Sequence, residues 1–394
     1  MQPEVSTLVP RRMERAYAWI QILAAALILI LAAGVLKIGS APYIAFAFAG
    51  SFLIFLRTSP SRAEIAWSVA AGAAFALVYY LHGGLLLPYF GSEIGTTGGF
   101  LGMGAVEVLA ARMALANPEE RPASLRRLLD AALIPSLCLG SMIAVSIAAY
   151  LTPITYDPVI YDFDLKFGGP PSWVVGAAFR SQPWLFSLAG HAYNCLPLAL
   201  SACLLLDTRR LSRHSEVNLM FAILLLGVAG FALYQICPVS GPVYLFPHDF
   251  PSHVPALAKA APSPLQEVPR NGMPSLHVAW TLLLFWNLRR RPVLAAVCLG
   301  LLVLTILATL GSGEHYLADL IVAPPLVLAI QSVCSRGDAV RLRWAFILGA
   351  AATLAWLIAF RTGIALSIPS GAPVWSLAFL SLALPAGVAR WAKL

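Results

Sequence analysis

The sequence predicts an all-α, polytopic membrane protein with about twelve transmembrane helices. Hydrophobic residues make up 59% of the chain and charged residues 11%, and the mean hydropathy is +0.80. A soluble domain cannot bury this much apolar surface, because its size fixes its ratio of surface to volume. Apolar runs of about 20 residues, the length that crosses a bilayer, recur along the chain. Short arginine clusters separate these runs, as in the loops of membrane proteins.

The first apolar run follows three arginines near the N-terminus. It is long and lacks a convincing cleavage site, so we interpret it as a helix and not as a secretory signal. The other runs follow with short loops between most of them. The predicted spans are 17–36, 41–56, 65–88, 98–115, 131–151, 184–206, 217–236, 273–288, 292–311, 315–333, 342–361 and 370–388.

The positions of the basic residues predict the orientation of these spans. If the N-terminus is cytoplasmic, 20 of the 26 Lys and Arg residues fall in cytoplasmic loops or tails, as the positive-inside rule requires. We therefore expect a multi-pass protein of the inner cell membrane with both termini in the cytoplasm. The same distribution argues against nucleic acid as a partner, because no basic face or tail is formed. The six cysteines contain no CxxC pair and are interpreted as small buried residues.

Two stretches between residues 270 and 319, RNGMPSLHVAW and GSGEHYLADLI, carry the residues expected of a catalytic site. His277 and His315 each lie near the extracytoplasmic end of a predicted span. Asp319 follows His315 by one helical turn, so their side chains should share a face. Ionisable residues are costly inside a membrane and usually functional there. We therefore predict an active site just below the extracytoplasmic surface, where ATP is absent and preformed phosphate esters are the substrates.

These residue types suit a displacement at phosphorus. Pro274 fits the first turn of a helix, where Ser275 and free backbone N–H groups can meet an anion. Asp319 can fix the tautomer of His315 and make its other nitrogen nucleophilic, while His277 protonates the leaving oxygen. The resulting phosphohistidine would be resolved by water or by another alcohol. The alternatives are structural roles for the histidines, or a zinc site formed by both of them with Asp319.

Met273–Trp280 and Glu314–Ile321 resemble the second and third signature motifs of the type 2 phosphatidic acid phosphatase superfamily. They are most similar to the branch that contains fungal inositol phosphorylceramide synthase. The resemblance implies a six-helix core and a two-step mechanism without metal or cofactor. It also implies that His315 is the nucleophile, Asp319 its partner and His277 the acid/base. The predicted domains are a membrane region over 1–130, a catalytic core over 131–334 and a two-helix region over 335–394.

The sequence departs from the phosphatases of that superfamily at three places. Their first motif has no good counterpart, and the corresponding region is YQICPVSGPVY at 234–244. The arginine that stands six residues before their nucleophile is Thr309 here, and the glycine of their second motif is Leu276. A monoester dianion needs more positive charge than a diester, so these losses favour a diester substrate. Arg270 is the best remaining candidate for a phosphate contact.

We expect the enzyme to move a phosphate-containing head group, for example of the phosphoinositol type, from a phospholipid donor to a lipid alcohol. With water as acceptor, the enzyme would be a lipid phosphate or polyprenyl diphosphate phosphatase. The sequence makes no prediction of the oligomeric state. A twelve-helix transporter is the alternative of another class, although no repeated half is visible. A lipid-linked glycosyltransferase, using the acids of 152–183, is a third. The predicted substrate-binding residues are Arg270, Ser275, Tyr316, His191 and Tyr234, of which His191 and Tyr234 also suit contacts between helices.

The extracytoplasmic loop 237–272 is long and carries eight prolines. Loops of this length are usually functional or disordered. Because it precedes the motif with His277 directly, we expect it to cover the site.

Overall fold

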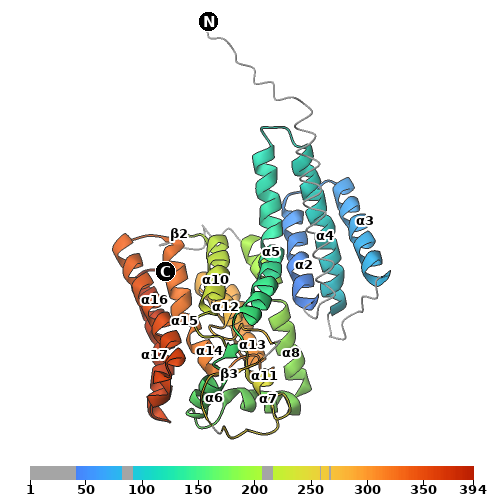
Figure 1. Cartoon of the computed structure of the whole chain (residues 1–394). Helices are drawn as coiled ribbons and strands as arrows, with labels where there is room; N and C mark the ends of the chain where they lie inside the picture. The colour runs from blue at the N-terminus through green and yellow to red at the C-terminus, as the bar shows by residue number, and fades with distance from the viewer. Residues whose placement is uncertain (1–40, 82–91, 206–215, 258, 266–267) are drawn as a thin grey trace. The chain divides into compact units, whose positions relative to one another are not determined.

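A computed structural model of the chain describes residues 41–81, 92–205, 216–257, 259–265 and 268–394. They form two compact units, coloured by chain position in Figure 1. Unit 1 takes its residues from Met1–Leu139 and Pro197–Leu205, and unit 2 from Gly140–Leu196 and Leu206–Leu394. Among the described residues, the regular structure is α-helical apart from the 3-10 turn η2 (Ile364–Ser367) and two ladders of two-residue strands. The division into domains at 130 and 334 stays a prediction.

Unit 1 is a small helical bundle. It contains α2 (Ala41–Arg57), α3 (Arg62–Leu81), α4 (Ser92–Leu115), α9 (Leu196–Leu205) and the first part of α5 (Arg121–Leu151). Helix α4 packs against both α2 and α3. Gly102 allows this approach, because a Cβ there would lie 1.7 Å from the carbonyl oxygen of Phe48. Small residues permit such close helix contacts within a membrane.

Unit 2 contains the predicted site. Its helices and 3-10 turn are α6 (Asp157–Leu165), α7 (Pro171–Ser181), α8 (Pro183–Asn194), α10 (Leu219–Leu233), α11 (Pro242–Leu245), α12 (Leu276–Leu288), α13 (Pro292–Gly311), α14 (Leu317–Ile321), α15 (Ala323–Val333), α16 (Ala339–Arg361), η2 (Ile364–Ser367) and α17 (Ala372–Trp391). Helix α12 is buried on nearly every side and packs against α10, α13 and α15. Its leucine- and tryptophan-rich sequence is that of a helix surrounded by protein.

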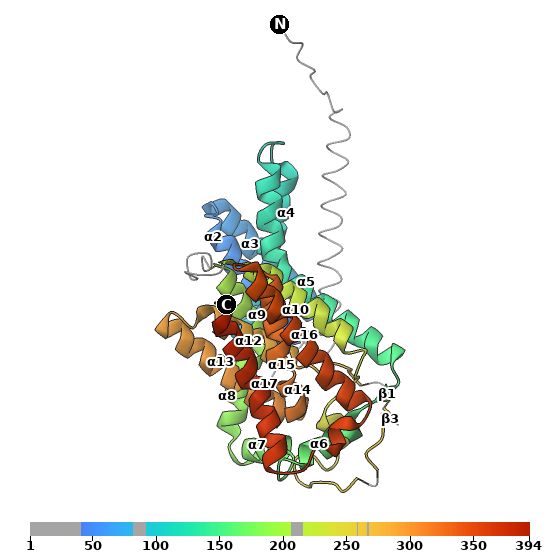
Figure 2. The ribbon, with the colours of Figure 1, turned by 90° about the vertical axis from the view of Figure 1, so that its left-hand side faces the viewer.

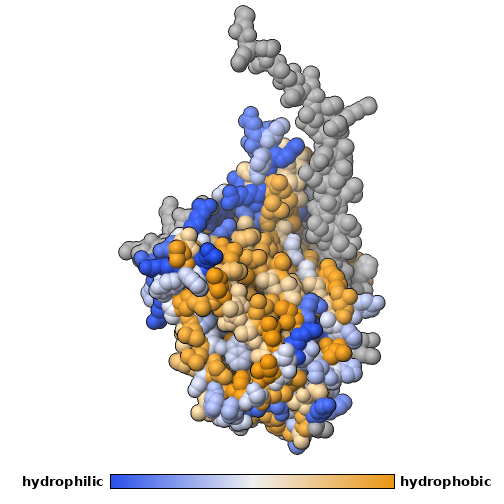
Figure 3. All heavy atoms as spheres, turned by 60° about the vertical axis from the view of Figure 1, so that its left-hand side comes forward, coloured by the Kyte–Doolittle hydropathy of each residue, from blue (hydrophilic) through white to orange (hydrophobic). Residues whose placement is uncertain are grey.

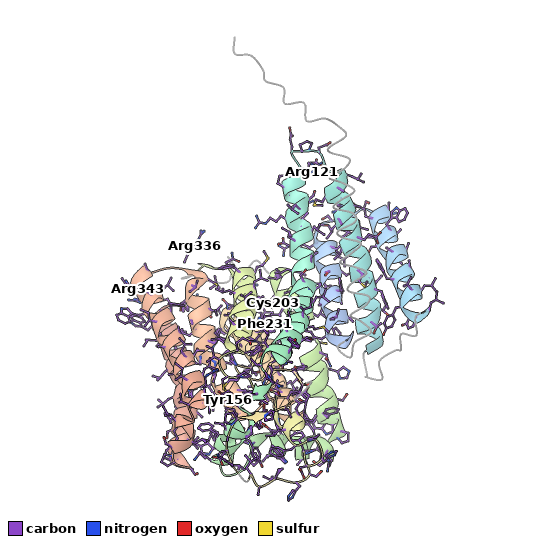
Figure 4. All side chains as sticks on the ribbon, in the orientation of Figure 1. Arg121, Tyr156, Cys203, Phe231, Arg336 and Arg343 are labelled. Carbon is purple, nitrogen blue, oxygen red and sulfur yellow. The ribbon has the colours of Figure 1, made fainter. Side chains whose placement is uncertain are left out.

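Different elements of the fold lie at the two ends of unit 2. At one end β2 (Glu216–Val217) pairs with β4 (Ser335–Arg336), and Arg336 and Arg343 are labelled there in Figure 4. The last residue of the chain also lies at this end, where the Leu394 carbonyl accepts a hydrogen bond from Arg289. At the other end, Figures 1 and 2 show α6, α7 and the ladder of β1 (Ile154–Thr155) with β3 (Ser263–Pro264).

The outward faces of α16 and α17 are apolar. Trp344, Phe346, Phe379 and Leu382 are exposed there, and orange side chains cover much of the visible face in Figure 3. Soluble monomers rarely expose large contiguous apolar patches. Together with the apolar helices described next, these faces identify a multi-pass membrane protein.

The prediction of about twelve spans is wrong. Among the described residues, six helices are long and apolar enough to cross a membrane, or seven if the bent pair α8 and α9 counts as one span. The predicted span 273–288 is reduced to α12, and 13 residues cover only about 20 Å of the roughly 30 Å hydrocarbon layer. The span predicted over 315–333 is divided between α14 and α15.

Prolines accompany these interruptions. Pro324 and Pro325 follow the break between α14 and α15, and Pro197 follows the break between α8 and α9. A hydropathy average still scores such stretches as continuous, because one or two prolines hardly lower an average over about 20 residues. The first predicted span, 17–36, lies outside the described residues.

Candidate active site

His315 and Asp319 meet at the start of α14. Nδ1 of His315 lies 3.3 Å from Oδ2 of Asp319, and both side chains are buried. The same carboxylate oxygen accepts a hydrogen bond from the Tyr316 N–H at 2.9 Å. The spacing predicted this contact, but not how it forms, because α14 begins at Leu317 and His315 precedes the helix. The tight turn at Tyr316, and not a helical face, brings the two side chains together.

The second motif reaches the first through Ser275. Its Oγ lies 3.4 Å from Nε2 of His315, and its backbone N–H donates to the Asp319 carbonyl oxygen at 3.2 Å. Helix α12 begins at Leu276, three residues after the start of the predicted span 273–288, so Pro274 stands before the helix and Ser275 is its N-cap. The Ser275 side chain makes no capping bond. It therefore faces His315, beside the first N–H groups of α12, which lack partners within the helix.

His277 lies in the first turn of α12 and is half-buried. The ring of Tyr193 stacks on it, with centroids 4.2 Å apart and planes inclined by 26°. The Tyr193 hydroxyl lies 3.2 Å from Nδ1 of His277 and donates to Oε2 of Glu314 at 3.0 Å. A positive charge on His315 would repel one on His277. The sequence did not single out Tyr193, which stands two residues after His191.

Two buried aspartates of α6 hold the backbone around His315. The Asp164 carboxylate accepts hydrogen bonds from the N–H groups of Leu317 and Ala318, at 2.8 and 3.1 Å, and so caps α14. Asp157 accepts from the N–H groups of Ser240 and Gly241, at 2.9 and 2.7 Å. These two acids belong to the stretch 152–183, whose acids the glycosyltransferase alternative would use. Both instead serve as acceptors for the backbone of the site.

Gly241 brings the preceding loop against the turn before His315. Its φ is +123°, and a Cβ there would lie 2.5 Å from the Glu314 carbonyl oxygen. The next N–H, that of Val243, donates to the Gly313 carbonyl at 2.9 Å. Only glycine combines this backbone conformation with this approach. The loop 237–272 thus supports the His315 turn from the side of residues 241–243.

Arg270, predicted to contact phosphate, lies among protein acceptors. Its side chain is buried and donates five hydrogen bonds, to the carbonyls of Thr152, Pro153, Leu265 and Val268 and to the Ser240 hydroxyl. A guanidinium has five N–H groups, so all its donors are used inside the protein. Arg270 joins the loop that holds β3 to the residues just before β1 and to the segment before α11.

We expect Arg270→Ala to destabilise this loop, because it leaves buried carbonyl groups without donors. The loss should be on the order of 3 kcal/mol, with Arg270→Lys intermediate because it lacks the planar fork. Thermal unfolding of the protein in detergent and proteolysis of the loop 237–272 measure the effect. If Arg270→Ala stays as stable as the wild type but binds donor lipid poorly, Arg270 binds phosphate and does not mainly stabilise the loop.

The remaining predicted residues lie around this centre. Nδ1 of His191 contacts the Ser187 carbonyl within α8. Tyr234 is buried at the end of α10, within electrostatic range of the Asp319 carboxylate. Tyr316 is buried in the hydrophobic core of unit 2. In the described part of the chain, no three His, Cys, Asp or Glu residues are grouped so that they could hold a metal ion.

Burial makes the acids of α6 resist ionisation. Desolvation is the main cause that raises the pKa of Asp164 to about 8 and that of Asp157 to about 6, against the hydrogen bonds from backbone N–H groups, which lower them. The charge of Asp319 raises both pKa values further. Carboxylates that share a dry site cannot all ionise.

The raised pKa of Asp164 predicts a pH-dependent stability. Its folded pKa of about 8 exceeds the unfolded value of about 4, so its stabilising contribution is complete below about pH 4 and is lost as the pH rises through 8. Asparagine cannot titrate. The melting temperature of the wild type should therefore fall relative to that of Asp164→Asn between about pH 5 and pH 8.5. Thermal melts across this range test it, and a difference that stays constant or grows in favour of the wild type would refute it.

Comparison with known proteins agrees with the motifs. Residues 159–333 match the model of the PAP2 superfamily, a family of lipid phosphatases and phosphotransferases. The match includes His277, His315 and Asp319 and runs from α6 to the end of α15. No curated protein and no solved structure matches the chain significantly. The matched domain is therefore that of an enzyme. This favours an enzyme over the transporter that the sequence leaves as an alternative.

Proposed function

We propose that this membrane enzyme, which carries a PAP2 superfamily domain over residues 159–333, transfers a phosphate-containing head group between lipids. The donor is a phospholipid and the acceptor a lipid alcohol. The group carried is a phosphodiester head group such as phosphoinositol. The observation that carries the proposal is the meeting of Ser275, His315 and Asp319, which presents Nε2 of His315 beside the start of α12.

In the first step Nε2 of His315 attacks the phosphorus of the donor. The Asp319 carboxylate accepts the hydrogen bond from Nδ1–H, so the lone pair is on Nε2, the atom that faces Ser275. The bond between phosphorus and the lipid oxygen breaks, and His277 gives its proton to that oxygen. The head-group phosphate is then bound to His315.

In the second step the acceptor alcohol loses its proton to His277 and attacks the phosphorus. The bond to Nε2 breaks, the new phosphodiester leaves, and both histidines return to their starting states. The Ser275 hydroxyl and the first N–H groups of α12 bind the phosphate oxygens throughout, aided by the positive end of the helix dipole.

In the described part of the chain, the small number of cationic groups free to bind phosphate at the site supports a diester substrate over a monoester. Arg270, the cation that the sequence placed nearest to the motifs, uses all its donors on protein groups. Neutral donors and one helix terminus suit a single negative charge better than a dianion. Hydrolysis remains the second candidate function, because the matched family includes phosphatases.

We place the site at the extracytoplasmic side of the inner membrane. The predicted cytoplasmic arginines Arg336 and Arg343 lie at the end of unit 2 that also holds the C-terminus (Figure 4). Helix α6, which caps the His315 turn, lies at the other end (Figure 1). This supports the positive-inside orientation with the termini in the cytoplasm.

A transfer assay in detergent micelles tests the function. The purified protein receives a phospholipid labelled in its head group, with or without ceramide or diacylglycerol. Labelled lipid product that requires the acceptor, and that is absent with His315→Ala, supports head-group transfer. Release of the phosphorylated head group or of free phosphate, independent of the acceptor, would instead identify a hydrolase.

A further inference from the structure

We infer that Tyr193 and Glu314 form a second histidine–carboxylate system, which positions His277 and stabilises its protonated form. The inference rests on the proposed function, in which His277 is the acid/base. Tyr193 lies on α8 and Glu314 directly precedes His315, so neither belongs to the segment that carries His277.

The hydroxyl of Tyr193 links the carboxylate to the imidazole. It lies 3.0 Å from Oε2 of Glu314 and 3.2 Å from Nδ1 of His277. A hydroxyl has one proton to donate, and a carboxylate is a stronger acceptor than a neutral ring nitrogen. The Tyr193 hydroxyl therefore donates its hydrogen bond to Glu314. The lone pairs of its oxygen can then accept a hydrogen bond from Nδ1 of His277. Nδ1 then carries a proton, and Nε2 is the nitrogen that exchanges protons with the substrate.

The aromatic ring of Tyr193 adds a second restraint. It lies on the imidazole with a centroid distance of 4.2 Å, and the Trp280 ring approaches the imidazole edge-on at 6.2 Å. The stack fixes the plane of the imidazole. A positive charge on His277 also gains from the electron-rich face of a phenol whose hydroxyl is bound to a carboxylate.

The two histidines thus differ in how a carboxylate reaches them. Asp319 contacts His315 directly, at 3.3 Å, whereas Glu314 reaches His277 through Tyr193. A nucleophile needs one fixed tautomer with a free lone pair, which a direct contact gives. An acid/base must both hold and release a proton. A carboxylate that acts through the Tyr193 hydroxyl stabilises the positive charge of the imidazolium without itself binding the proton that is transferred. The ionisable groups that face His277 in the described part of the chain include His315, whose positive charge would repel that of His277, and the pair Tyr193 and Glu314.

A graded series of variants separates the contributions. Tyr193→Phe keeps the stacked ring and removes the hydroxyl, and Tyr193→Leu removes both. Glu314→Gln keeps an acceptor for the hydroxyl and removes the charge. Tyr156→Phe is the matched control, since its ring lies under Arg361, 5.8 Å from the guanidinium carbon, and an aromatic ring is kept.

Kinetics with donors of different leaving groups is the first measurement. Tyr193→Phe should lower kcat about tenfold to 100-fold for an alkyl leaving group and little for a nitrophenyl one, with KM unchanged. The alkaline limb of the pH–rate profile should move to lower pH in Tyr193→Phe and in Glu314→Gln. The double variant should be no slower than Tyr193→Phe, because both act through one link. Equal losses for all leaving groups, or additive losses, would overturn the inference.

A second measurement does not depend on turnover. The protein contains seven histidines, and ¹⁵N spectra of histidine-labelled protein in detergent, compared with His277→Gln, identify the His277 signals. We expect neutral His277 to be protonated on Nδ1 in the wild type and to lose this preference in Tyr193→Phe. An unchanged tautomer would overturn the inference even if the enzyme is active. The expected tautomer in a protein that turns over no lipid would uphold it and reject the proposed function instead.

Discussion

Replacing His315 with alanine is expected to abolish turnover of every lipid donor while the protein stays folded. The reason is the position of its Nε2 beside Ser275, with Nδ1 held by Asp319. Without this nitrogen no covalent intermediate forms, and a direct attack by the acceptor lacks an activated nucleophile. We expect a loss of at least about 10³-fold in kcat, the scale seen when a nucleophile is removed.

His248→Ala is the matched control for this experiment. Its side chain is exposed in the loop 237–272, so it should keep wild-type activity and stability. Product formation is followed with labelled phospholipid, and folding by the melting temperature and elution volume in detergent. Folded His315→Ala protein with more than a few per cent of wild-type turnover would refute the nucleophile assignment.

Replacing His277 with alanine should have the second largest effect, and one that depends on the leaving group. A general acid contributes about 10²–10⁴-fold when the leaving oxygen is a poor leaving group. An alkyl alcohol such as diacylglycerol needs that proton, whereas nitrophenolate leaves without it. We therefore expect a large drop in kcat with phospholipid and a small one with a nitrophenyl phosphodiester.

The comparison of the two donors distinguishes catalysis from structure. His277 starts α12 against Tyr193, so a structural role would lower the rate for both donors by the same factor. Parallel losses would therefore contradict the acid/base assignment. His277→Gln serves as a second variant, since it fills a similar volume and cannot supply the proton.

The central contacts of the site could be predicted from the sequence. The spacing of His315 and Asp319 indicated their contact, and the two motifs suggested that His277 and Ser275 would meet them. The structure brings Ser275 and His315 together across 40 positions. These residues stand out because polar groups are rare in apolar runs and each has a chemical reason to be there.

The supporting residues could not be predicted in the same way. Asp164 caps a helix that starts 153 positions later, and Tyr193 reaches His277 across 84 positions. No periodicity marks such contacts, because they depend on how the helices pack. The contacts of Arg270 could not be predicted for a similar reason, since the sequence does not show that loop carbonyls occupy its donors. The number of spans was overestimated because hydropathy does not register where an apolar run is broken.

Direct detection of the intermediate tests the central claim most sharply. The enzyme is mixed with a donor phospholipid labelled with ³²P and quenched within milliseconds to seconds, and its peptides are analysed by mass spectrometry. The proposal predicts the phosphorylated head group on the peptide that contains His315, in an acid-labile and alkali-stable bond. This label should disappear when acceptor lipid is added and be absent from His315→Ala. Turnover without any labelled peptide, or a label on another residue, would contradict a covalent mechanism through His315.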